Sequence, residues 1–106
     1  MENTTPRRSP RICIHIPVLL IWKEWTDEDQ EEHREQTFTF SVSWFGCAVH
    51  SYKFFRPGTE VRLEREGTTI EGRVIYSLWD HSTNLVEVGL AWDQDAREFW
   101  GISVWV

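Results

Sequence analysis

Two groups of side chains in this sequence have the types and spacing to bind a ligand. The arginines of the run R-R-S-P-R are Arg7, Arg8 and Arg11. The small residues of the run S-V-S-W-F-G are Ser41, Ser43 and Gly46. A guanidinium group can clamp a phosphate or pair bidentately with guanine, and a serine hydroxyl or glycine N–H can contact a base edge. These residues predict a site for a small anionic ligand.

Motifs that would indicate catalysis are missing from the sequence. It contains no G-x-S-x-G, no glycine-rich phosphate loop before a helix, no H-E-x-x-H and no C-x-x-C. The four histidines are not at metal-ligand spacing, and Cys13 and Cys47 are too few for a disulfide framework, so we interpret both as free buried thiols. We therefore predict a protein that is not an enzyme and holds no metal or cofactor.

Length and charge set further bounds. With 106 residues the chain has room for one domain, and seven Trp and six Phe supply large apolar areas for a small core. The longest apolar run, residues 16–22, is too short to cross a bilayer, so we expect a cytoplasmic protein without membrane insertion. The net charge of −6 argues against DNA or RNA as a partner, since nucleic acid needs a broad cationic surface.

Apolar periodicity predicts the first part of the fold. Residues 1–10 are polar and contain two prolines, so we expect a flexible N-terminal arm before a domain spanning 11–106. Alternating isoleucines predict a first strand from residue 11, and the acidic stretch 26–35 is typical of a solvated hairpin loop. Strict alternation over 37–44 predicts a second strand. Its inward residues would be Phe38, Phe40, Val42 and Trp44, with Ser41 and Ser43 facing outward.

The second half of the chain continues in the same way. Turn signals at 57–58, 66–67 and 80–84 separate apolar runs whose predicted core residues are Leu63, Val74, Val88 and Leu90. Residues 93–100 break the alternation and indicate at most a short helical turn. Six or so strands at this spacing predict an all-β, closed or nearly closed antiparallel barrel. The tryptophans are mainly core residues in this interpretation, although Trp44 could flank a bound base.

The two motifs, in this order, resemble those of the PilZ domain, which are R-x-x-x-R followed by [D/N]-x-S-x-x-G. The later segments R-P-G-T-E-V, I-E-G-R-V, V-G-L and F-W-G-I also resemble that family, over about residues 7–105. The resemblance implies a six-stranded β-barrel of split-barrel type that binds the bacterial second messenger cyclic di-GMP. By position, Arg7 and Arg11 match the motif arginines, with Arg8 adjacent, while Ser43 and Gly46 match the motif serine and glycine.

Ser41 departs from this pattern, because the family has Asp or Asn there. The second motif is therefore degenerate, and two functions remain open. One is a non-enzymatic cyclic di-GMP sensor or adaptor in bacterial signalling, in which the ligand orders the arm and changes the surface shown to a protein partner. The other is a PilZ-like protein-interaction module that no longer binds nucleotide. A third, an oligonucleotide-binding barrel with stacking tryptophans, is disfavoured by the acidic charge.

Overall fold

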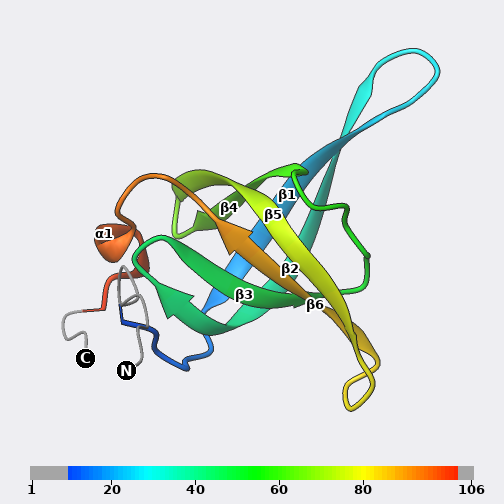
Figure 1. The fold of residues 1–106 in the computed structure, drawn as a ribbon. Coiled ribbons are helices and arrows are strands. Elements are labelled where there is room, and N and C mark those ends of the chain that lie inside the picture. The colour runs from blue at the N-terminus through cyan, green and yellow to red at the C-terminus, as the bar shows by residue number, and fades with distance from the viewer. Residues whose placement is uncertain (1–9, 103–106) are drawn as a thin grey trace, which may run out of the picture.

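The computed structural model describes residues 10–102, which form six strands and one short helix (Figure 1). The elements are β1 (Pro17–Trp25), β2 (Gln30–Ser43), β3 (Gly46–Ser51), β4 (Glu60–Arg65), β5 (Thr68–Asp80), β6 (Leu85–Ala91) and α1 (Arg97–Trp100). The strands pair antiparallel in the order β1-β2-β3-β6-β5-β4, and β4 pairs with β1 to close the barrel. The predicted all-β, six-stranded antiparallel barrel with a short C-terminal helical turn is confirmed.

The barrel interior is filled by the apolar side chains that alternate along each strand. Five of the predicted core residues are each at most 1% exposed: Val42, Leu63, Val74, Val88 and Leu90. The rings of Trp22, Phe55, Trp92 and Trp100 belong to the same cluster. Each large apolar side chain buried in this way contributes about 1.5–3 kcal/mol to stability. Among the tryptophans of residues 10–102, three are therefore core residues, whereas Trp25 and Trp79 are exposed.

The register predicted for residues 37–44 is wrong at its start. Phe38 is 54% exposed and Phe40 is only partly buried, so neither is a core residue. A β-bulge after Thr39 shifts the pairing with β3. Beyond the bulge Val42 is fully buried, as predicted. One inserted residue therefore decides which face of β2 points into the barrel.

Threonines occupy the interior positions before the bulge because their hydroxyl groups are hydrogen-bonded there. Thr37 Oγ1 donates to the carbonyl of His50 at 2.6 Å. Thr39 Oγ1 donates to the carbonyl of Ile14 at 2.7 Å and accepts from the N–H of Ile16 at 2.9 Å. A buried hydroxyl with partners avoids most of its desolvation cost. The displaced Phe40 ring stacks instead on the outward-facing ring of His50, at 4.6 Å between centroids.

The segment before β1 is not a regular strand, although its alternation predicted one. It contacts β2 through one isolated bridge between Ile12 and Val42, with N–O distances of 2.9 and 2.8 Å. Regular pairing starts at Pro17, whose missing N–H suits the first position of a strand. The apolar face was predicted correctly, because Ile12 and Ile14 pack against the core. The arm before this segment lies outside the described residues.

Beyond the barrel, β1 and β2 continue as a long hairpin that projects from the body of the molecule (Figure 1). The prediction of a loop over 26–35 is wrong for its second half, since β2 begins at Gln30. The turn is closed by the N–H of Thr26, which donates to the carbonyl of Asp29 at 2.7 Å. Strand pairing survives the dense acidic charge because cations lie among the carboxylates. For example, Lys53 contacts Glu24 at 2.9 Å.

Candidate functional site

The outer wall made of β2, β3, β6 and β5 carries two adjacent rows of small residues. Cross-strand pairing aligns the first row as Ser41, Ala48 and Gly89, ending at Tyr76 on β5. It aligns the second row as Ser43, Gly46 and Ala91. The alternation along each strand keeps these side chains outside the barrel. The six small side chains, serines, alanines and glycines, extend only a short way from the wall. The wall is therefore hollowed over four strands.

We call this hollow the small-residue depression; its volume is about 270 Å³. It is lined by Arg11, Ser41, Val42, Ser43, Phe45, Gly46, Cys47, Ala48, Ile75, Tyr76, Gly89, Leu90 and Ala91. Four of the six residues predicted to bind a ligand therefore lie together, namely Arg11, Ser41, Ser43 and Gly46. Arg7 and Arg8 lie outside the described residues.

Arg11 reaches the depression because of how its neighbour is anchored. The two backbone bonds between Ile12 and Val42 fix the segment along β2, and the Ile12 side chain packs on the core. Arg11 therefore points to the outside, where it is exposed beside the two serines of β2. Within residues 10–102 its guanidinium makes no ion pair, so its charge is available to an anion.

The turn between β2 and β3 is held by the C-terminal part of the described chain. Trp100 Nε1 donates to the carbonyl of Ser43 at 3.1 Å, and Trp92 Nε1 donates to that of Trp44 at 3.0 Å. The N–H of Trp92 also donates to the carbonyl of Phe45 at 3.1 Å. These donors come from buried, well-packed indoles. The backbone of the S-x-x-G turn is consequently fixed without any ligand.

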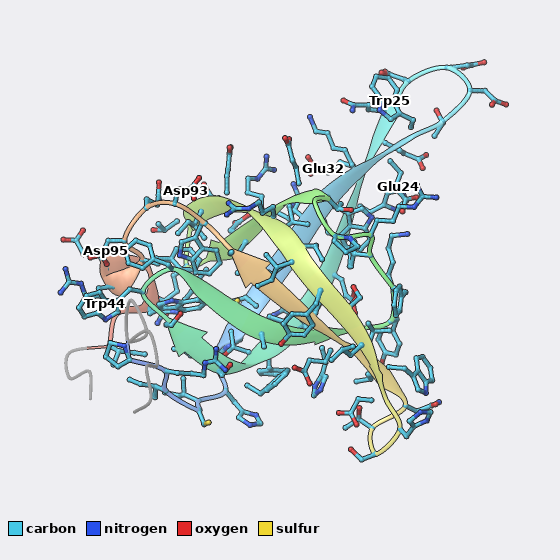
Figure 2. The ribbon with its side chains drawn as sticks, viewed as in Figure 1. Glu24, Trp25, Glu32, Trp44, Asp93 and Asp95 are labelled. Atoms are coloured by element: carbon cyan, nitrogen blue, oxygen red, sulfur yellow. The ribbon has the colours of Figure 1, made fainter. Side chains whose placement is uncertain are left out.

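The ring of Trp44 packs outside this turn rather than inside the depression. Arg97 lies over it, with 4.2 Å from the guanidinium carbon to the ring centroid. Asp95 holds Arg97 through an ion pair of 2.6 Å, and Figure 2 shows Trp44 and Asp95 next to α1. Trp44 does not belong to the core cluster, so the inward position predicted for it is wrong, and it does not line the depression either. Its place in the wall is taken by the neighbouring Phe45.

Gly46 is required by the approach of two strands. A Cβ at this position would lie 2.5 Å from the carbonyl oxygen of Leu90 on β6. Its φ is not positive, so a left-handed conformation is not the reason for glycine here. The Ser43 hydroxyl donates to the Gly46 carbonyl at 3.2 Å. A ligand would thus meet a serine and a glycine that are already positioned by the fold.

Comparison with known proteins identifies the architecture. No protein-family model and no curated protein matches the chain. Among solved structures, the Bacillus subtilis inhibitor of motility (MotI/DgrA) is similar, with a TM-score of 0.67, 19% sequence identity and 95% of this chain covered. The fold is PilZ-like. The match covers 49% of the solved chain, so this barrel spans about half the length of that protein.

Two titratable groups besides Arg11 line the depression of this PilZ-like barrel. Burial raises the pKa of the Cys47 thiol, which therefore stays protonated and is a poor nucleophile. Burial, together with a hydrogen bond to Glu87, raises the pKa of Tyr76 to about 12. Neither group is a base or nucleophile near neutral pH. Besides these groups, the wall presents one cation, two hydroxyls and apolar surface.

Sequence reasoning missed the other half of the wall. Ala48, Gly89, Ala91 and Tyr76 belong to strands that were predicted, but nothing pointed to them as site residues. The available signal was the repeated pattern of small residues two apart, G-C-A in β3 and G-L-A in β6. Residues two apart share a face, so each pair leaves two adjacent outward positions open. Only the order of the strands shows that these gaps join those of β2.

A second concavity of about 650 Å³ lies outside β1, β4 and β5; we call it the charged groove. Its lining includes Lys23, Arg62, Glu71, Arg73 and Asp93. Arg62 contacts Glu32 at 3.5 Å, and Arg73 contacts Asp93 at 3.4 Å. Figure 2 shows Glu32 and Asp93 on this side of the barrel. Its arginines are thus already neutralised by carboxylates of the protein.

The described part of the chain lacks two further kinds of feature. Residues 10–102 contain no cluster of three or more histidine, cysteine or acidic side chains suited to a metal ion. They also contain no helix with the length and apolarity needed to span a bilayer. Both cysteines are free, but Cys13 is exposed rather than buried as predicted, because it faces outward beside Ile12.

Proposed function

We propose that this PilZ-like barrel is a non-enzymatic sensor or adaptor that binds cyclic di-GMP in the small-residue depression. One observation carries the proposal: Arg11, Ser41, Ser43 and Gly46 come from two separate motifs, and all four line the same hollow. Their proximity was expected from the motif resemblance alone. A depression with the guanidinium of Arg11 at its rim suits a ligand with phosphate groups and guanine edges.

Each wall residue has a role in this proposal. Arg11 pairs with a phosphate or with guanine O6 and N7, and the two serine hydroxyls contact the base edge or the phosphate. The arm, through Arg7 and Arg8, supplies the second motif arginine and covers the ligand. Ser41 is shorter than Asp or Asn and carries no charge. Losing one good base contact costs about 1–3 kcal/mol, so we expect weaker binding than an intact motif would give.

The alternative is a protein-interaction module whose nucleotide site has decayed. Ser41 favours it, and so does the exposed apolar surface of Phe38, Ile75 and Leu78 on β2 and β5. An adaptor that binds no nucleotide would use such a surface constitutively. In the sensor, ordering of the arm over the depression would change what this surface presents.

Titration calorimetry of the full chain with cyclic di-GMP tests the proposal. We expect saturable binding that Arg11→Ala weakens by about tenfold or more, because a charge-assisted hydrogen bond is worth about 1.5–3 kcal/mol. The matched control is Arg56→Ala, which removes an exposed arginine that does not line the depression. If neither the natural chain nor Ser41→Asp binds at high micromolar ligand, the sensor is rejected and the interaction module takes its place.

A further inference from the structure

Tyr76 stands at the β5 end of the first row of small residues and lines the depression opposite Arg11. Its cross-strand partner is Gly89 on β6. A Cβ on Gly89 would overlap Cε2 of the tyrosine and would lie 2.5 Å from Cδ2 and 2.6 Å from Cζ. The two carbons that flank Cε2 are thus almost equally distant from that point. Both are also only slightly farther from that point than Cε2 itself, which places the glycine over the flat side of the ring; an approach along the ring edge would leave them clearly farther.

The ring therefore lies flat against the barrel, in the space that a side chain at position 89 would fill. Its hydroxyl donates to Glu87 Oε2 at 2.7 Å, which fixes the rotation of the ring about its bonds. Tyr76 is only partly buried. One face is covered by Gly89, so the exposed part includes the opposite face, which borders the depression.

The charge of Arg11 acts on the phenol of Tyr76. It lowers the pKa of that group, although burial raises the same pKa by a larger amount. The guanidinium and the aromatic ring therefore share one site. A cation for phosphate, hydroxyls for a base edge and a fixed aromatic face together match the chemistry of a nucleotide rather than that of a simple anion. None of the sequence motifs contains the aromatic face.

We propose that the outer face of Tyr76 is a stacking platform for one base of the bound nucleotide. This inference rests on the proposed function and adds to it the residue that contacts the flat side of the base. Gly89 and Glu87 act as positioning residues, because they hold the ring and do not touch the ligand. The platform is pre-formed, so stacking requires no rearrangement of the ring.

The experiment compares three variants of the full chain by calorimetry with cyclic di-GMP. Tyr76→Leu removes the aromatic face and should weaken binding by about tenfold, within the range found when stacked aromatics are replaced. Tyr76→Phe keeps the face, loses only the hydroxyl, and should bind within about twofold of the natural chain. The control is Phe38→Leu, which removes an exposed aromatic ring outside the depression and should change nothing.

A second measurement does not depend on any variant being folded. In the natural chain, the guanine H8 resonance of the ligand should move upfield on binding and show nuclear Overhauser effects to the Tyr76 ring protons. Absence of both in a saturated complex overturns the platform but leaves the proposed function standing. Equal affinities of Tyr76→Leu and the natural chain have the same meaning. No binding by the natural chain overturns the platform and the proposed function together.

Discussion

The two outer walls of the barrel differ in what covers them. Outside β1, β4 and β5 the outward side chains are long and charged, and Arg62 and Arg73 are paired with carboxylates. In the small-residue depression of the other wall most of them are small, and Arg11 has no ion pair within the described residues. The charged groove is the larger concavity, yet both of its arginines are paired, whereas Arg11 has no ion pair within residues 10–102. The two concavities therefore differ in the pairing of their arginines as well as in volume.

One isoleucine on each wall gives the largest expected effect. Ile21 faces outward from β1, between its cross-strand partners Arg34 and Arg62, yet is only 2% exposed; Ile75 on the other wall is 50% exposed. We expect Ile21→Ala to lower the free energy of unfolding by about 2–5 kcal/mol. Ile75→Ala should change it by less than about 0.5 kcal/mol. Urea denaturation measures both; equal losses would show that the two walls are covered alike.

Restoring the family residue in the depression should have the next largest effect. Ser41→Asp gives the wall a carboxylate for the donor edge of guanine, so affinity for cyclic di-GMP should rise by about 1 kcal/mol or more. Calorimetry measures this change, with Ser41→Ala as the control that adds no acceptor. An affinity that falls in Ser41→Asp would indicate that repulsion from the ligand phosphates exceeds the new base contact.

The salt dependence of binding should separate the two sets of arginines. Raising the ionic strength screens an exposed charge, so affinity for the dianionic ligand should fall with added salt. Arg11→Ala should flatten that dependence, whereas Arg62→Ala should leave it unchanged because Arg62 is on the other wall and paired with Glu32. Parallel slopes for Arg11→Ala and the natural chain would place the relevant cation elsewhere.

The smallest effect concerns high pH. The pKa of Tyr76 is raised from 10.0 to about 12, chiefly by burial and then by Glu87. A proton held more tightly in the folded state stabilises it fully below pH 10.0, and this stabilisation is lost as the pH rises toward about 12. The natural chain should therefore lose more unfolding free energy than Tyr76→Phe over that interval. Denaturation curves at both ends of it provide the test, and identical losses would contradict the pKa shift.

Local pattern was enough to predict the barrel, but it was not enough to orient every strand. The alternation of Phe38 and Phe40 with two threonines indicated the strand correctly and its faces wrongly. Judged by apolarity alone, phenylalanine is expected in the core and threonine at the surface. Here the threonines are buried instead, because the hydroxyl groups of Thr37 and Thr39 find hydrogen-bond partners in the interior. Those partners, on β3 and on the segment before β1, are distant in sequence. The bulge after Thr39 then restores the register without leaving a signal in composition.

The candidate site likewise has residues that the sequence could identify and residues that it could not. Arg11 and the two serines could be named from sequence because they belong to short motifs with a fixed spacing. Tyr76 and Gly89 could not, because they meet across two strands whose pairing is known only from the fold. The turn at Ser43 is a further case, since its carbonyl is bound by Trp100, 57 positions away. Side chains that act through cross-strand neighbours are invisible to a search along the chain.

The dependence of the turn on Trp92 and Trp100 also has a consequence for biosynthesis. A ribosome delivers β2 and β3 long before these two indoles, so the nascent chain lacks the donors that fix the turn carbonyls. The turn at the end of the small-residue depression is then fixed only after the segment containing α1 has emerged, although most of the lining residues are made much earlier. During that interval the half-built barrel exposes unpaired strand edges, the stage at which a β protein is most prone to aggregate.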